Sequence, residues 1–187
     1  MGNSESLLSE GEILELHKST EFSVREINEL LERYAQFITQ PSAGNEKDVQ
    51  GLTVDECLMI PEFSGSLYLR PVIEKFLDES QTYLLPYKFI QLCALLSPHT
   101  DVQKKRSFLY NHLHLLRDVV LTHEGVFRLL KQLYSNSLSD DRLLDITCQI
   151  MNDPRLAAPG QIHKNELDKM ITNNEIRNHL TIDFYFT

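Results

Sequence analysis

The chain has 187 residues, 42% of them hydrophobic and 24% charged, which is enough apolar material for the core of one domain or of two small lobes. Its 18 Lys and Arg residues stand against 27 Asp and Glu residues, and the net charge of −9 argues against unaided binding to nucleic acid. The sequence holds no apolar run long enough for a membrane span and no signal peptide, so we expect a soluble, cytoplasmic protein.

The first six residues fit the pattern for N-myristoylation, because Gly2 follows the initiator methionine and Ser6 stands four residues later. We therefore expect myristate on the Gly2 amine. One acyl chain binds membranes only marginally, and the first 15 residues contain no Lys or Arg to strengthen the attraction. An acylated chain is thus expected to visit membranes reversibly or through a partner.

Helices are predicted along most of the chain. The first 18 residues allow a short amphipathic helix, and a capping box of Ser23 and Glu26 opens a longer one whose apolar residues recur at helical spacing. A second capping box, Thr53 with Glu56, opens a short helix. Further helices are predicted at 68–77, 86–97, 101–113, 123–134, 140–151 and 164–171.

Short extended stretches precede four of these helices, at Leu52, 83–85, 119–121 and 161–162. Each stretch is followed at once by a helix start. The chain is therefore predicted to be all-α, with four helix–loop–helix units that each carry a short loop strand.

Residues that could carry catalysis or bind a structural metal form no recognisable pattern. The cysteines, Cys57, Cys93 and Cys148, include no close pair and are expected to be reduced thiols. The sequence has no His-Glu-x-x-His, no phosphate-binding glycine motif and no Gly-x-Ser-x-Gly. We therefore predict that the protein is not an enzyme. The basic run 104–106 is interpreted as a solvated helix face, and the alternative is a contact with an acidic patch of a partner.

Three segments have the residue order of a known family. Segment 52–63, Leu-Thr-Val-Asp-Glu-Cys-Leu-Met-Ile-Pro-Glu-Phe, resembles the end of the first EF-hand in calcineurin B-like proteins. Segment 19–34 is similar to the N-terminal helix of the calcium- and integrin-binding proteins within that group, and 179–186 is similar to their extended tail. The resemblance runs from about residue 15 to the end and implies a two-lobed EF-hand fold.

The resemblance also implies a division of the chain. We expect an N-terminal segment, two EF-hand pairs and an extended tail, at 1–18, 19–97, 98–177 and 178–187 respectively.

The candidate calcium loops depart from the family pattern, which places oxygen ligands at positions 1, 3, 5, 7, 9 and 12 and Gly at position 6. The four loops are 45–56, 77–88, 114–125 and 155–166. None has more than two carboxylates or carboxamides at ligand positions, and Lys88 and Arg155 bring cations to two of them. We predict that calcium binding is lost and that there is no cofactor. The hydrophobic residue at position 8 is kept in all four loops, as Leu52, Leu84, Leu121 and Ile162.

The end of the chain alternates apolar with polar residues, which is typical of an extended segment with one buried face. The apolar members are Leu180, Ile182, Phe184 and Phe186. The resemblance implies that this tail docks in the groove that receives a partner helix, where the two would compete. The alternative is that the tail is a permanent part of the core.

Other apolar residues at helical spacing are first of all core candidates. The resemblance implies that some of them line the groove between helix pairs. The candidates are Leu92, Leu95, Leu96, Phe108, Leu113, Leu129, Leu133, Ile146 and Ile150.

The resemblance implies a non-enzymatic adaptor that binds an amphipathic helix of a larger protein independently of calcium. The expected partner is the cytoplasmic segment of a membrane protein, or a kinase, which could bring the protein to a membrane. The alternative is a regulatory subunit of a phosphatase or other enzyme, as calcineurin B is. No nucleic-acid partner is expected.

Overall fold

The computed structural model describes residues 7–38, 51–64, 69–112, 120–134 and 137–186. By internal contacts the chain divides into two units. Unit 1 is Met1–Thr100 with Thr181–Thr187, and unit 2 is Asp101–Leu180. The chain thus enters unit 2 at Asp101 and returns to unit 1 at Thr181.

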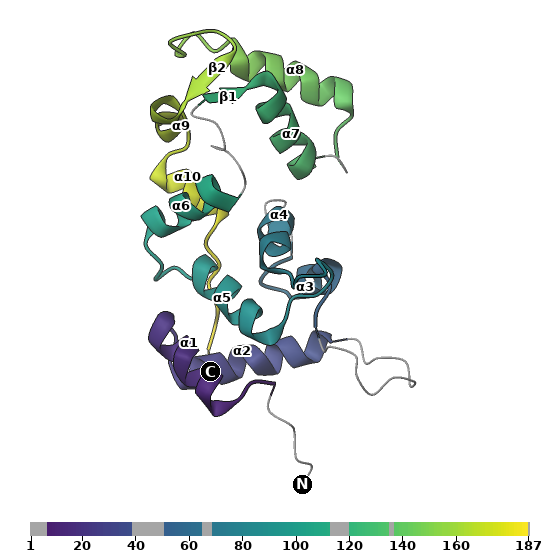
Figure 1. Ribbon diagram of the computed structural model, residues 1–187, viewed down its shortest axis with the longest axis vertical. Helices are drawn as coiled ribbons and strands as arrows, with labels where there is room; N and C mark the ends of the chain where they lie inside the picture. Colours follow the sequence, from purple (N-terminus) through teal and green to yellow (C-terminus); the bar gives the residue numbers. More distant parts are fainter. Residues whose placement is uncertain (1–6, 39–50, 65–68, 113–119, 135–136, 187) are drawn as a thin grey trace. The chain divides into compact units, whose positions relative to one another are not determined.

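Unit 1 contains five of the α-helices that the structure describes (Figure 1). They are α1 (Glu10–Ser19), α2 (Val24–Phe37), α3 (Val54–Met59), α4 (Leu69–Ile73), which continues as a 3-10 turn at Glu74–Phe76, and α5 (Pro86–Leu96). Capping boxes at Ser9, Ser23 and Thr53 open the first three helices. Pro86 begins α5, where its missing N–H costs no hydrogen bond.

Aromatic side chains from different helices form the core of unit 1. Tyr34 on α2 and Phe89 on α5 have ring centroids 5.1 Å apart, and Phe63 lies 6.0 Å from Phe89. All three are almost completely buried. The Tyr34 hydroxyl donates to the carbonyl of Leu84 at 2.6 Å, so the one polar group of this cluster is paired.

Unit 2 contains the remaining described elements. They are α6 (Val102–His112), β1 (Val120–Thr122), α7 (His123–Tyr134), α8 (Asp140–Met151), β2 (Gln161–His163), α9 (Lys164–Met170) and α10 (Asn173–His179). Its core gathers buried residues from the strands and the helices that follow them, namely Tyr110, Leu121, Val126, Met151, Ile162 and Leu167.

The loops of each unit are joined in pairs through the hydrophobic residue at position 8. In unit 2, β1 and β2 run antiparallel with Leu121 opposite Ile162. In unit 1, Leu52 N–H donates to the Leu84 carbonyl at 3.0 Å and Leu84 N–H donates back at 2.7 Å. The hydrophobic residue named at position 8 of each loop therefore takes part in one of these two pairings. The mostly helical structure with its small loop sheet is consistent with a calcineurin B-like EF-hand fold.

Two details differ from the sequence-based expectations. The helix predicted at 68–77 is α at Leu69–Ile73 and then narrows to a 3-10 turn. Helix α10 is not among the predicted helices, although Thr172 and Glu175 form the capping box that opens it. It runs to His179 and so includes the first two residues of the segment expected as the tail.

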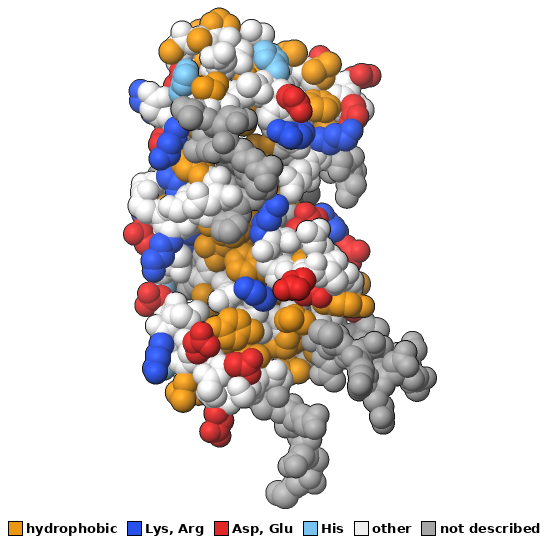
Figure 2. All heavy atoms as spheres, viewed as in Figure 1, with side chains coloured by type: hydrophobic (Ala, Val, Ile, Leu, Met, Phe, Trp, Pro, Cys, Tyr) orange, Lys and Arg blue, Asp and Glu red, His pale blue; other side chains and the backbone are white. Residues whose placement is uncertain are grey.

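The two units carry very different charge. Unit 1 has 17 acidic and 7 basic residues, a net charge of −10, whereas unit 2 has 10 acidic and 11 basic residues, a net charge of +1. Figure 2 shows carboxylates over α1 and α3, interspersed with apolar side chains. No helix in the described part of the chain combines the length and apolar character that crossing a membrane requires.

Candidate functional site

The C-terminal tail lies against unit 1, running past α5 towards α1 and α2 (Figure 1). The backbone N–H of Ile182 donates to the carbonyl of Leu96, at the end of α5, at 2.8 Å. The Phe184 ring meets Phe22 and Phe63 edge-on, each at a centroid distance of 6.3 Å. The tail therefore packs on an apolar surface of unit 1 that is partly aromatic.

Arg33 on α2 holds the far end of the tail. Its guanidinium donates to the carbonyl of Tyr185 and lies 5.7 Å from the centroid of the Phe186 ring. Glu62 pairs with the same guanidinium at 2.5 Å and keeps it in place. Phe186 also contacts Phe22, with centroids 5.8 Å apart.

The burial of the tail follows the predicted alternation. Ile182, Phe184 and Phe186 are partly buried, whereas Asp183 is exposed and Tyr185 is 76% exposed. Leu180, which belongs to unit 2, is buried. Each apolar member thus faces protein, and the polar edge faces solvent.

The groove candidates named from the sequence are divided between the two units. Leu92, Leu95 and Leu96 lie on α5 in unit 1, and Leu92 and Leu96 are fully buried. In unit 2, Leu129 and Ile150 pack on the core cluster. The other described candidates there, Phe108, Leu133 and Ile146, are partly buried, while Leu113 and the acylation candidate Gly2 lie outside the described residues.

Sequence reasoning missed the residues that contact the tail, Phe22, Arg33 and Phe63. Phe22 precedes the N-cap of α2, a position that predicts contact only with its own helix. No local pattern connects these residues with a tail at the other end of the chain.

The second loop, 77–88, is closed by the carboxylate of Asp78. This residue stands at position 2, which is not a calcium-ligand position. Asp78 Oδ1 accepts the backbone N–H groups of Thr82 and Tyr83, both at 3.0 Å. The Ser80 hydroxyl donates to the same carboxylate at 2.7 and 2.8 Å. These bonds, chiefly that from Tyr83, lower the pKa of Asp78. Asp and Ser are residues that favour such turns, and that was the available signal.

The fourth loop is closed in a similar way by Glu166, its last residue. One carboxylate oxygen accepts the N–H of Ala157 at 2.6 Å, and the other accepts the N–H of His163 at 2.8 Å. Both bonds favour the ionised form and lower the pKa of Glu166. Gly160, at position 6, has φ +79°, the left-handed conformation that favours glycine.

The residues of these two loops do not fit a calcium ion. Lys88 ends the second loop, and Arg155 begins the fourth, where it pairs with Asp153 at 2.6 Å. Both oxygens of Glu166, which a calcium ion requires as a bidentate ligand, already bind backbone amides. Within the described residues, no three His, Cys, Asp or Glu side chains are placed to hold a metal ion. The first halves of the first and third loops lie outside the described residues.

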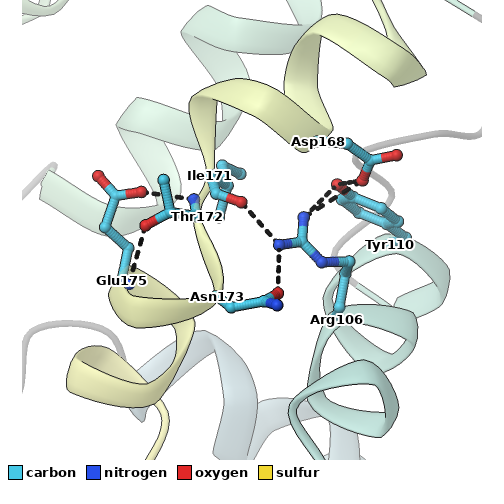
Figure 3. A network of polar contacts seen from close by, with 7 residues as sticks. All are labelled: Arg106, Tyr110, Asp168, Ile171, Thr172, Asn173 and Glu175. Carbon is cyan, nitrogen blue, oxygen red and sulfur yellow. Dashed lines mark hydrogen bonds and ion pairs between the residues drawn. The ribbon is translucent and has the colours of Figure 1, made fainter.

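A polar network connects α6 with α9 and the start of α10, all in unit 2 (Figure 3). Arg106 donates to Asp168 at 3.2 Å, to the carbonyl of Ile171 at 2.8 Å and to Asn173 at 2.9 Å. The Tyr110 hydroxyl donates to Asp168 and accepts from Arg106 at 3.1 Å. The network fixes α9 and α10 against α6 within unit 2.

All three cysteines are free thiols. Cys57 and Cys93 are buried and Cys148 is exposed. Burial, with a smaller effect of Glu56, raises the pKa of Cys57 to about 12, so this thiol is a poor nucleophile at neutral pH.

The paired helix–loop–helix units are consistent with a calcineurin B-like EF-hand fold. The chain is 28% identical over 184 residues to the calcineurin B chain of Naegleria gruberi, covering 97% of this chain and 99% of the relative. It is 26% identical over 175 residues to the type 1 calcineurin B chain of Dictyostelium discoideum, covering 94% and 93%. The type 2 chain of that organism is 23% identical over 188 residues, covering 98% of each. No model of a protein family matches the chain.

Proposed function

We propose that this chain is a regulatory, non-catalytic subunit that binds and controls a larger catalytic protein, a phosphatase of the calcineurin kind. The observation that carries the proposal is the similarity to calcineurin B proteins along 97% of this chain and 99% of the relative. It supports the phosphatase alternative better than an adaptor for a membrane protein or a kinase.

The proposed binding surface is the apolar surface of unit 1 that the tail covers. Phe22 and Phe63 contact the apolar face of the tail, and an amphipathic helix offers the same kind of apolar stripe. A partner helix would displace the tail and take over these contacts. The acidic surroundings in unit 1 favour a helix whose polar face carries Lys and Arg.

Co-expression with the calcineurin-type catalytic subunit of the same organism tests the proposal. We expect the two chains to co-elute as one complex and the phosphatase rate to differ from that of the catalytic subunit alone. A control catalytic subunit that lacks the helix for its regulatory partner is expected to elute separately. Separate elution of the intact catalytic subunit would overturn the proposal.

We further propose that this control does not use calcium. The support is the donor chemistry of the second and fourth loops, where Lys88 and Arg155 stand at ligand positions and Glu166 is bound to backbone amides. Calorimetric titration of the full chain is expected to find no site tighter than roughly 10⁻⁴ M, the weak end of EF-hand affinities. A micromolar site would contradict this proposal and restore a calcium switch.

Myristoylation of Gly2 remains a proposal based on the sequence pattern. Intact mass of the native protein is expected to show the myristoyl increment, and Gly2→Ala is expected to abolish it. An unmodified native chain would leave any membrane contact to the partner.

A further inference from the structure

A pocket of about 720 Å³ lies beside the fourth loop in unit 2. This volume falls within the range of about 300–1,000 Å³ that is usual for ligand sites. Its lining includes three cationic side chains, Arg155, Lys164 and Lys169, and two apolar ones, Leu156 and Met170. In a chain with a net charge of −9, such a group of cations around a cavity is notable.

The acidic residues of the pocket are already engaged. Glu166 accepts hydrogen bonds from the backbone amides of Ala157 and His163. Asp168 accepts from Tyr110 and Arg106, as the dashed lines of Figure 3 show. Both carboxylates therefore already accept hydrogen bonds from residues of unit 2.

The lysines differ from Arg155 in their engagement. Arg155 is held by both carboxylate oxygens of Asp153. Lys164 and Lys169 are exposed, and neither forms an ion pair within the described part of the chain. Lys164 Nζ lies 5.9 Å from the centroid of the Tyr110 ring, a cation–π contact that uses none of its N–H groups in a conventional hydrogen bond. The two lysines are thus the charges that a ligand can use.

From this arrangement we infer that the pocket binds an acidic peptide segment of the partner. Its carboxylates pair with Lys164 and Lys169, and an apolar side chain among them rests on Leu156 and Met170. The charge of the units supports this occupant, because unit 1, at −10, repels an acidic segment and unit 2, at +1, does not. One part of this inference rests on the proposed function, namely that the acidic segment belongs to the catalytic partner.

The test uses two short fluorescent peptides, Glu-Glu-Leu-Glu-Glu and its neutral counterpart Gln-Gln-Leu-Gln-Gln, and the full chain. Fluorescence anisotropy at about 0.1 M salt, where the Debye length is about 10 Å, is expected to show that the Glu peptide binds at least about tenfold tighter than the Gln peptide. The double variant Lys164→Glu/Lys169→Glu is expected to lose that preference, a drop of about tenfold or more. Circular dichroism checks its folding, and Lys164→Gln/Lys169→Gln replaces it if the charge reversal prevents folding.

A matched control separates the pocket from general charge. Lys104→Glu/Arg128→Glu makes the same change of charge at two exposed residues of unit 2 that do not line the pocket. It is expected to change the affinity by less than about threefold, because charges distant from the ligand are screened. Equal losses in both double variants, or equal binding of the two peptides, would overturn the inference. Peptide binding without co-elution of the catalytic subunit would overturn only the proposed function.

Discussion

Lys105 shows that a run of consecutive cationic residues in the sequence does not predict which of their side chains are exposed to solvent. The interpretation of the run 104–106 as a solvated face is wrong for two of its three residues. Lys105 is only 1% exposed and its ammonium donates to the carbonyl of Leu180 at 2.6 Å. Arg106 is mostly buried in the network of Figure 3, and Lys104 alone is exposed. Consecutive helical residues point about 100° apart, so three in a row cannot share one face.

We predict that Lys105→Ala destabilises the protein by about 2–4 kcal/mol, because it leaves a cavity and an unpaired carbonyl at Leu180. The neighbouring Lys104→Ala, on the same helix but exposed, is expected to change stability by less than about 0.5 kcal/mol. Urea unfolding followed by circular dichroism measures both. Similar midpoints for the two variants would mean that the buried contact contributes nothing.

Glu166 makes stability depend on pH. Its hydrogen bonds from the Ala157 and His163 amides lower its pKa, so the folded state holds the ionised form more strongly than the unfolded state does. The stabilisation is therefore fully present above the ordinary carboxyl pKa and is lost as pH falls through the lowered folded pKa.

We predict that Glu166→Gln lowers Tm by several degrees at neutral pH, because a carboxamide presents one acceptor and one donor to two N–H groups. The difference from the unsubstituted chain is expected to shrink as pH falls below the ordinary carboxyl pKa and through the lowered pKa of Glu166, where the carboxylate itself becomes protonated. Scanning calorimetry across this range measures it, with Asp145→Asn, an exposed carboxylate of α8, as the control. A difference in Tm that stays constant with pH would contradict the account.

At the scale of elements, local patterns predicted most helices and the hydrophobic residue that each loop contributes to its pairing. Capping boxes and apolar spacing are local patterns. The paired residues can also be found locally, because each stands at position 8 of its loop: Leu52, Leu84, Leu121 and Ile162. Helix α10 escaped prediction because it is too short to show a clear apolar period, so the cap at Thr172 is its main local signal. The residues under the tail were not predicted for a different reason. Phe22 and Phe184 meet through tertiary packing, which produces no periodic pattern in the sequence.

We predict that the tail can be displaced from the apolar surface of unit 1 on which it packs. Deletion of 181–187, which spares α10 and the buried Leu180, is expected to leave the chain folded and to raise the fluorescence of the apolar dye anilinonaphthalene sulfonate severalfold. Phe184→Ala is expected to give part of this increase, and Tyr185→Ala almost none, because the Tyr185 side chain is 76% exposed. Partner affinity is expected to rise on deletion. Unfolding of the truncated chain would show instead that the tail is core.

At the scale of the whole molecule, the contrast in charge is the property that no single residue reveals. Unit 1 has a net charge of −10 and unit 2 a net charge of +1. Like charges repel within a compact unit and raise its free energy relative to the unfolded chain. Unit 1 therefore carries a cost that a cationic partner helix would relieve on binding, whereas unit 2 carries almost none. If unit 1 binds its partner as proposed, its stability and its recognition of that partner are coupled.

We predict that added salt stabilises unit 1 more than unit 2 in the full chain. The Debye length falls from about 30 Å at 0.01 M to about 10 Å at 0.1 M, so sodium chloride over this range screens repulsion within a unit of this size. Hydrogen exchange read by mass spectrometry is expected to slow by roughly threefold to tenfold in peptides of α1, α2 and α5, and to change little in α7 and α8. Glu21→Gln/Glu32→Gln, which removes two exposed charges from unit 1, is expected to reduce the salt effect there, while Glu124→Gln/Asp145→Asn in unit 2 leaves it unchanged. Equal slowing in both units would point to a general effect of salt on burial and would contradict repulsion as the cause.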